Sequence, residues 1–310
     1  YTKESEIVKS HYTATNLAYL SLVFMGGPSK VIVERVQTSD DISDALERLK
    51  NKRWYYLAVP GLGDGETDTV VEYIKEQRTQ YHKTFKAVLP SVTADNEGII
   101  NFATDNIKVG AKTYTTAEFC CRIAGILAGL PLNRSATYYT LPEVESITES
   151  ETPDDDVDNG KLILINDGTK IKIARGVNSL TSTTEDKGED FKKIKIIEAV
   201  DMIRDDIRAT FEDEFVGKVE NSYDNKIVFI AAVNKYFKDL ANRGVLYDKY
   251  DNKAEIDIDE TREWLSKTRD VSSWDDEKIR TANTGTNVFV RASIQIQDAI
   301  EDLKFGIYIE

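Results

Sequence analysis

A glycine-rich loop is the first stretch whose residue types and spacing could do chemistry. Residues Gly61–Gly65 read GLGDG, after an apolar run and before a helical pattern, which is where a dinucleotide-binding loop would lie. The spacing does not fit, because the last glycine of G-x-G-x-x-G would fall at Glu66. Carboxylates also stand where a phosphate would bind, at Asp64, Glu66 and Asp68. The pattern favours a tight turn that caps the next helix, and a nucleotide-dependent α/β enzyme using Gly61–Gly65 remains the alternative function.

An acidic stretch in the middle of the chain has part of a calcium-binding pattern. Asp154, Asp156 and Asp158 have the alternate spacing that begins such a loop. The sixth position is Asn159 rather than glycine, and the twelfth is Ile165 rather than glutamate. A capped and solvated helix end therefore explains these residues better than a metal site.

Histidines and cysteines are too few for a zinc site. His11 and His82 have no cysteine or second histidine at ligand spacing. The adjacent Cys120 and Cys121 would point about 100° apart on a helix, which is poor geometry for a disulfide, and buried thiols are expected. A Ser-His or Cys-His pair assembled by the fold stays open. No catalytic, cofactor-binding or metal-binding residue is predicted, and nothing in the sequence demands an enzyme.

Composition and charge limit the classes of partner. The chain has 310 residues, 41% hydrophobic and 30% charged, with a net charge of −14. A broad nucleic-acid-binding face is unexpected, since such faces are basic, and the acidic excess suits solubility or a basic partner. No run reaches the roughly 18 apolar residues of a membrane span, so membrane insertion is not predicted. Tyr1 is not a natural start, which leaves an upstream signal or arm open.

The first part of the chain alternates between helix and strand patterns. Helices are predicted over 16–25, 40–50 and 70–81, and strands over 31–36, 54–59 and 85–89. This order implies right-handed crossovers and a small parallel sheet of three strands. We therefore predict an N-terminal α/β domain.

A short β segment over 98–114 precedes the clearest helix start. Thr115 and Glu118 form a capping box, in which each side chain bonds the other residue's main-chain N–H. The helix over 118–130 that follows contains small residues whose spacing would let another backbone come close: Ala124, Gly125, Ala128 and Gly129.

The clearest strand-turn-strand signal follows a helix start at Thr152-Pro153. The apolar run 162–165 predicts a strand buried on both faces, and the alternating run 170–173 predicts a strand with one solvated face. Asn166-Asp167-Gly168 between them predicts a hairpin with a type I′ turn.

The last part of the chain predicts an α+β domain with two long helices and a terminal β-sheet. A helix over 194–215 has apolar residues at Ile196, Val200, Ile203, Ile207 and Phe211. A second over 224–243 has them at Ile227, Ile230, Val233, Phe237 and Leu240, and Gly244 supplies its C-cap. These helices are expected to pack as a hairpin. A strand over 254–258 and a helix over 259–267 follow. The domains are expected at residues 1–183 and 184–310, with a split that can interleave.

Two alternating strand patterns end the chain, over 288–296 and 303–309. In the second, the apolar residues are Leu303, Phe305, Ile307 and Ile309. A strand with so strict a two-residue period needs a partner edge. Because it lies at a chain end, that edge can belong to another molecule, so we predict an inter-subunit strand.

Several motifs in this order resemble contractile phage tail sheath proteins. They are residues 114–118, 122–132, 135–138, 160–181, 193–196, 215–222 and 298–302. The resemblance covers about Asn16 to Glu310, and is greatest to the short sheath proteins of Gram-positive myophages, PBSX-like defective phages and phage-tail-like bacteriocins. It implies a structural subunit, not an enzyme.

The resemblance also implies how such a subunit would work. Sheath subunits stack as hexameric rings in a helical array around a tail tube protein, between baseplate and tail terminator proteins. Their terminal arms add strands to a neighbour's sheet, and contraction drives the tube through the cell envelope. The particle would be a virion tail or a phage-tail-like particle assembled in the host bacterial cytoplasm. The N-terminal arm is expected before Tyr1, and its absence from this sequence is the main departure from the family pattern.

Overall fold

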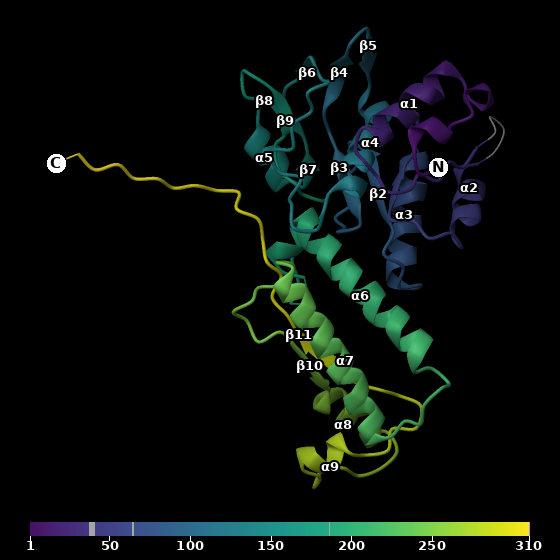
Figure 1. The fold of residues 1–310 in the computed structure, drawn as a ribbon, viewed down its shortest axis with the longest axis vertical. Coiled ribbons are helices and arrows are strands. Elements are labelled where there is room, and N and C mark those ends of the chain that lie inside the picture. Colours follow the sequence, from purple (N-terminus) through teal and green to yellow (C-terminus); the bar gives the residue numbers. More distant parts are fainter. Residues whose placement is uncertain (37–40, 64, 186, 310) are drawn as a thin grey trace. The chain divides into compact units, whose positions relative to one another are not determined.

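The chain divides into two compact units. The computed structural model describes residues 1–36, 41–63, 65–185 and 187–309, so the predictions that fall on Asp40, Asp64 and Glu310 lie outside the described residues. The first unit comprises residues 1–198 with 299–310, and the second comprises 199–298 (Figure 1). The predicted fold class is confirmed: a small parallel sheet with helices comes first, and long helices with a small sheet follow. The expected domain boundary after Thr183 stays a prediction.

A parallel sheet between two layers of helices is the centre of the first unit. Its strand order is β1 (Tyr56–Ala58), β2 (Lys86–Pro90), β3 (Ile99–Phe102) and β7 (Lys161–Leu162). Side chains of neighbouring residues in β2 point to opposite faces. One face packs on α2 (Ile42–Leu49) and α3 (Glu66–Thr79), and the other on α4 (Thr116–Gly129), with α1 (Ala14–Phe24) beyond it. The predicted elements over 16–25, 40–50, 54–59, 70–81 and 85–89 are confirmed within a few residues.

The strand predicted over 31–36 is wrong. These residues lie outside the parallel sheet, and Val31 exchanges hydrogen bonds with the main chain of Tyr1 at 2.8 and 2.9 Å. Strands of a parallel sheet are covered on both faces, whereas residues 31–34 are only half-buried. Glu34 instead pairs with Arg48 and Lys52 at 2.5 and 2.9 Å.

A close approach of two backbones joins α1 to α4. A Cβ atom added at Gly125 would overlap the main chain of Val23, and one at Gly129 would overlap the carbonyl of Gly26. The predicted close packing at the small residues of this helix is therefore confirmed. The predicted capping box is also present: Thr115 Oγ1 accepts from the Glu118 N–H at 3.3 Å, and Glu118 Oε2 accepts from the Thr115 N–H at 3.0 Å.

The β segment predicted over 98–114 is three strands rather than one. β3 joins the parallel sheet, while β4 (Asp105–Val109) pairs antiparallel with β5 (Lys112–Tyr114) and with β6 (Ser146–Thr148). The short helix α5 (Pro153–Asp158) has its proline at the start, as predicted. Thr152 is the N-cap residue, and its side chain makes no capping hydrogen bond.

The predicted hairpin exists, but its turn differs. β8 (Leu164–Asn166) pairs antiparallel with β9 (Ile171–Ile173), and Leu162 belongs to β7, so the run predicted as one strand serves two sheets. A type I′ turn needs positive φ at two residues, and only Gly168 has it, at +89°. The loop is four residues long, because the Asp167 carboxylate accepts from the N–H groups of Thr169 and Lys170 and stabilises a wider turn.

A buried ion pair fastens the start of α6 (Ile194–Glu214) to the sheet. The ammonium of Lys86 is 1% exposed and lies 3.2 Å from the Glu198 carboxylate, while the rings of Tyr55 and Tyr56 flank it. The Tyr56 hydroxyl also donates to Glu198. Breaking one partner of such a pair leaves a buried charge uncompensated, which is strongly destabilising.

Asp95 provides a pH-dependent link within the first unit. Its carboxylate accepts from the main-chain N–H groups of Thr181 and Ser182 at 2.7 and 2.9 Å, and these bonds hold its pKa well below the usual range. A depressed pKa gives stability that is present above the unfolded-state value of about 3.9 and lost as the pH falls through the folded-state value.

We expect Asp95→Asn to lower the free energy of unfolding at pH 7 by roughly 1 kcal/mol, a figure reduced for solvent screening. Asparagine tolerates the left-handed backbone of this residue, whose φ is +46°. The difference should shrink steadily below about pH 4, as the carboxyl group becomes protonated first in the unfolded parent chain. Urea unfolding at several pH values measures it. The exposed Glu151, changed to glutamine, is the control, and a pH-independent loss at Asp95→Asn would contradict the argument.

The second unit contains most of α6, α7 (Tyr223–Asn242), a two-stranded sheet and short helices. The predicted hairpin of α6 and α7 is confirmed: Phe211 and Phe215 each contact the Phe229 ring, and the Tyr236 hydroxyl donates to Asp206 at 2.6 Å. Ile227, predicted on the apolar face, is 40% exposed, because the helix turns Phe229 inward instead. Gly244 follows α7 with φ +70°, as a C-terminal glycine should.

The small sheet of the second unit pairs β10 (Lys253–Ile256) with β11 (Val290–Ser293), antiparallel. α8 (Ile258–Ser266) and α9 (Asp276–Arg280) connect the two strands. The strand predicted over 254–258 and the helix predicted over 259–267 are confirmed within a few residues, while only 290–293 of the strand predicted over 288–296 forms a strand.

Candidate assembly interface

The glycine-rich loop is closed to phosphate by its own sequence. α3 begins at Glu66, and the Glu66 carboxylate accepts from the main-chain N–H of Gly63 at 2.7 Å. That N–H is the kind of donor that a phosphate would need. Gly65 has φ +91°, which suits a tight turn before the helix. The interpretation as a tight turn agrees with this geometry, whereas the N-cap residue of α3 is Gly65, which has no side chain to cap the helix.

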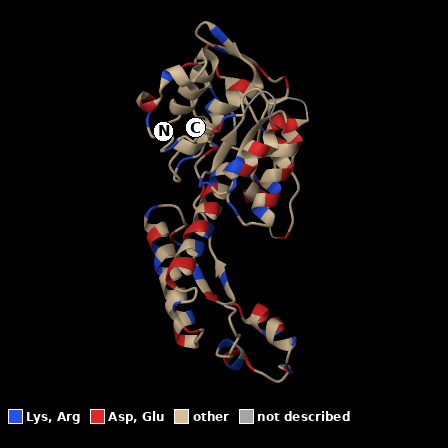
Figure 2. Cartoon of the chain, turned by 90° about the vertical axis from the view of Figure 1, so that its right-hand side faces the viewer, with Lys and Arg blue, Asp and Glu red and all other residues tan. Residues whose placement is uncertain are grey.

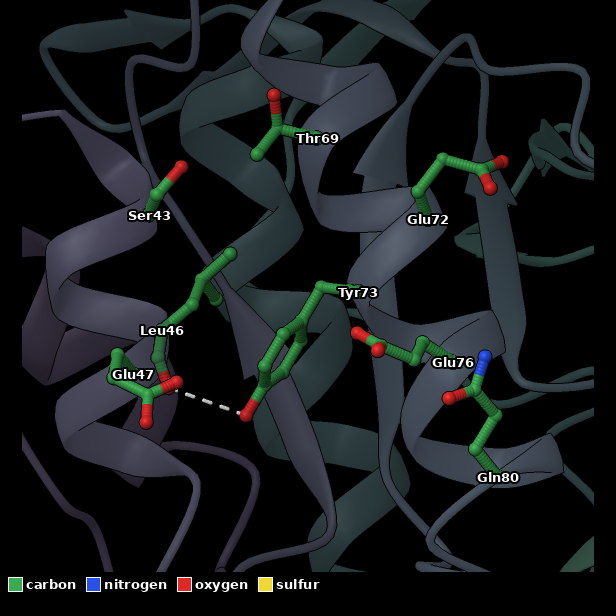
Figure 3. A pocket seen from close by; sticks show the side chains of 8 residues that line it. All are labelled: Ser43, Leu46, Glu47, Thr69, Glu72, Tyr73, Glu76 and Gln80. Carbon is green, nitrogen blue, oxygen red and sulfur yellow. Dashed lines mark hydrogen bonds between the residues drawn. The ribbon is translucent and has the colours of Figure 1, made fainter.

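The structure has a groove between α2 and α3 (Figure 3) that was not predicted from the sequence. It has a volume of about 460 Å³ and is lined by Ser43, Leu46, Glu47, Thr69, Glu72, Tyr73, Glu76 and Gln80. The lining contains three glutamates and neither lysine nor arginine, so it would repel a phosphate. The Tyr73 hydroxyl donates to the carbonyl of Leu46 at 3.2 Å, and burial raises its pKa to about 12.

Other candidate chemical groups are held in structural roles. Burial raises the pKa of the Cys121 thiol to about 12, and that of Cys120 well above its usual value, so neither is a reactive thiolate. In the acidic stretch, Asp156 binds Ser150 and Lys161. Over the described residues, the structure has no group of three His, Cys, Asp or Glu side chains that could hold a metal ion.

Lysine and arginine are intermixed with aspartate and glutamate over the described residues of both units (Figure 2). Among the helices that the structure describes, none combines the length and the hydrophobicity needed to cross a membrane.

The C-terminal segment 303–309 is extended and exposed (Figure 1). Its predicted inter-subunit residues Leu303, Phe305, Ile307 and Ile309 are 85, 77, 75 and 94% exposed. Side chains of this kind in an isolated chain mark an interaction site. Within the described residues, the segment belongs to no strand ladder, so its role as an inter-subunit strand stays a prediction.

An arginine fixes the point where this segment begins. Arg175 Nη1 donates to Glu301 at 3.2 Å, and Nη2 donates to Asp302. The Asp302 carboxylate raises the pKa of Arg175 the most, and the Glu301 carboxylate raises it further. Arg175 lies in the motif-rich run 160–181, but its partners more than a hundred residues away could not be identified from the sequence.

We expect Arg175→Met to release residues 299–302 without unfolding the first unit. A protease that cleaves after glutamate should cut at Glu301 several-fold faster, since two charge-assisted hydrogen bonds are lost. Limited proteolysis followed by mass spectrometry measures this. The exposed Arg134, changed to methionine, is the control, and unchanged cleavage at Glu301 in Arg175→Met would show that the clamp does not hold the segment.

An unpaired strand edge lies in the second unit. The side of 290–297 that faces β10 is hydrogen-bonded along its length. Residues 290–293 pair with β10, the Asn252 side chain accepts from the Gln295 N–H at 2.8 Å, and residues 295–297 bond to the main chain of 245–247. Strand residues point their main-chain N–H and carbonyl groups alternately to one side and the other. In four residues of this stretch, these groups therefore point away from β10. These residues are Val290, Ala292, Ile294 and Ile296, and the hydrogen bonds described for the chain leave their outward groups available.

Comparison with known proteins gives consistent matches. Residues 36–179 match the sequence model of the phage tail sheath protein central domain, and residues 186–310 match that of the phage tail sheath C-terminal domain. The tail sheath protein of Clostridium phage phiCD119 is 36% identical over 317 residues, which cover 99% of this chain and 88% of that protein.

Solved structures share the fold. A sheath tail protein from Desulfitobacterium hafniense aligns with a TM-score of 0.64 and 21% identity over 71% of this chain and 54% of its own. The contracted helical sheath of the anti-feeding prophage aligns with a TM-score of 0.69 and 13% identity over 99% of this chain and 85% of its own.

Proposed function

Because the chain belongs to the phage tail sheath protein family, we propose that its copies are joined by exchange of the C-terminal strand 303–309. The chain is a structural subunit of a tail sheath, so its function is assembly rather than catalysis. Neither its relatives nor the loop at Gly61–Gly65 supports the alternative of a nucleotide-dependent enzyme.

The match between the segment 303–309 and the edge 290–296 carries the proposal. Both are seven residues long, and each has four apolar side chains at alternate positions. The four apolar side chains of the edge lie on the same face of the small sheet as Ala254 and Leu246, which are 3% and 1% exposed. A strand added there would continue that apolar face and complete the missing hydrogen bonds.

Charge favours an antiparallel arrangement of the added strand. With the apolar residues aligned, a parallel strand would place Lys304 beside Arg291, and like charges directly opposite are destabilising. An antiparallel strand would place Tyr308 beside Arg291 instead, where a cation can lie over an aromatic ring. Antiparallel ladders are also slightly more stable per residue.

Burial of the segment supplies the energy of each joint. Four large apolar side chains that are at least 75% exposed would each contribute about 1.5–3 kcal/mol on burial. Association and ordering of the segment cost a large part of this. A single joint is therefore modest, and a lattice with one joint per chain is held by the sum.

The complete particle follows from the same proposal. Hexameric rings stack in a helical array around a tail tube protein, between baseplate and tail terminator proteins, in a virion tail or phage-tail-like particle assembled in the host bacterial cytoplasm. The extended array is metastable, and contraction buries more surface between subunits. Equal buried area in the extended and contracted arrays would contradict this account of the energy source.

A disulfide cross-link tests the strand exchange. Ser293 and Gly306 are the central residues of 290–296 and 303–309, so they lie opposite each other in either strand direction. A chain with both Ser293→Cys and Gly306→Cys should form a ladder of covalent multimers on oxidation, since opposite residues bring their Cβ atoms within about 5 Å. Denaturing, non-reducing gels measure it.

The single variants are the controls, since Cys120 and Cys121 are buried. Each single variant should stay at the mass of one chain. An assembled array of the double variant that forms no multimers on oxidation would rule out the edge 290–296 as the acceptor.

A further inference from the structure

The loop 284–287, which leads into the edge 290–296, is fastened to the residues just before α7. Asn221 Nδ2 donates to the carbonyl of Gly285 at 2.7 Å and to the carbonyl of Asn287 at 2.9 Å. The same nitrogen lies 3.3 Å from the hydroxyl oxygen of Thr284. One carboxamide thus contacts the loop at three points. The edge begins three residues after the last of them.

A buried lysine on the first turn of α7 completes this attachment. Lys226 Nζ donates to Thr284 Oγ1 at 2.9 Å, and that hydroxyl donates to the carbonyl of Asn287 at 2.5 Å. The Asn287 carbonyl therefore accepts from both Thr284 and Asn221, which uses both of its lone pairs. Thr284 is 1% exposed. The loop is consequently held from two side chains that precede it by about sixty residues.

Two groups of this attachment are unfavourable for stability. Lys226 is 7% exposed, and among the described residues no carboxylate lies within ion-pair distance of its ammonium, so burial lowers its pKa. Asn221 Oδ1 is buried and accepts no hydrogen bond from the described residues. A buried charge without a counter-charge costs free energy, and so does a buried acceptor without a donor. Such exceptions are expected at functional sites.

The attachment lies at the end of the edge that β10 supports least. β10 pairs with residues 290–293, and the Asp257 N–H bonds the carbonyl of Phe289 at 3.0 Å. The loop 284–287 lies directly upstream of these bonds. The end of a short ladder frays readily, and an edge that frays must be ordered again before a strand can pair with it, which weakens binding.

We infer that Asn221 and Lys226 are positioning residues for strand exchange: they hold the loop 284–287 so that the edge 290–296 stays extended and ready to pair with the segment 303–309 of a second copy. The inference rests on the proposed strand exchange. Neither side chain needs to touch the arriving strand. The motif 215–222 thereby contributes to assembly through Asn221.

A labelled synthetic peptide of residues 301–310 tests this by fluorescence anisotropy. The reference is the full chain with Phe305→Asp and Ile307→Asp, whose own segment should not occupy an edge. Adding Asn221→Ala should raise the Kd about tenfold, since the loop loses three contacts and the edge must be ordered on binding. Adding Lys226→Met should raise the Kd about threefold. Urea unfolding of that variant should show no loss of stability, because a buried charge is removed.

Ile203→Val in the reference chain is the control for stability alone. Ile203 is buried on α6 in the same unit, so the change lowers stability modestly and removes no hydrogen bond of the loop. Its Kd should equal that of the reference. An unchanged Kd in Asn221→Ala, or an equal rise in Ile203→Val, would overturn the positioning role and leave strand exchange standing. Absence of binding to the reference chain would overturn the edge 290–296 as the acceptor, and the inference with it.

Discussion

A chain that ends at Asp302 is expected to fold as the full chain does and to form no sheath-like polymer. Among the removed residues that the structure describes, 303–309, the side chains are exposed, so their removal should cost the first unit little stability. Thermal unfolding should therefore be nearly unchanged. Assembly should be lost, because the removed segment is the strand that we propose to join copies.

Electron microscopy and sedimentation of the two chains measure this effect. Apolar and polar side chains alternate along 303–309, so substitutions on its polar face are a matched control for substitutions on its apolar face. Aspartate at Phe305 and Ile307 should abolish assembly, since both lie on the apolar face, while alanine at Lys304 and Tyr308 on the other face should weaken it at most a few-fold. Helical tubes formed by the truncated chain would remove strand exchange as the link between copies.

Gly125→Ala is expected to destabilise the first unit by about 3 kcal/mol, at the upper end of the usual cost of overpacking. The added methyl group would overlap the main chain of Val23 on α1. A main-chain neighbour cannot swing aside as a flexible side chain does, so α1 and α4 must separate along their contact.

Urea denaturation measures the loss, and Gly188→Ala is the control. Gly188 has open space around the position of a Cβ atom and a φ of −77° that alanine adopts freely. The control should unfold at or slightly above the urea concentration of the parent chain. If Gly125→Ala matched the control, close contact of the two backbones would not be what sets the stability of this unit.

Local signals in the sequence predicted most elements well. The capping box at Thr115 and Glu118 is contained within four residues, and the long apolar periodicities define α6 and α7 by themselves. The small residues of α4 also predicted a close backbone contact, because only glycine permits one. In each case the information lies within one continuous stretch of the chain.

Predictions failed where distant residues decide the structure. The run 31–36 has a strand composition, but residues 99–102 and 161–162 complete the sheet instead. The run 162–165 is divided between two sheets, which no local pattern shows. The Arg175 clamp and the two hydrogen bonds between the Asn234 side chain and the main chain of Ala254 each join residues separated by 20 positions or more. For 303–309, alternation predicts a strand whose partner lies outside a single chain.

If the proposed exchange of 303–309 onto 290–296 joins the copies, an edge that accepts a strand and an arm that supplies one give the assembly a polarity. If every chain donates to the next and receives from the previous one, the contact is heterologous, and a row of copies has two chemically different ends. One end presents free arms, with alternating apolar side chains. The other presents vacant seven-residue edges, which attract further copies or unrelated strands. Growth can therefore be started at one end and stopped at the other by two dissimilar proteins, each of which needs only to imitate half of a single β-ladder.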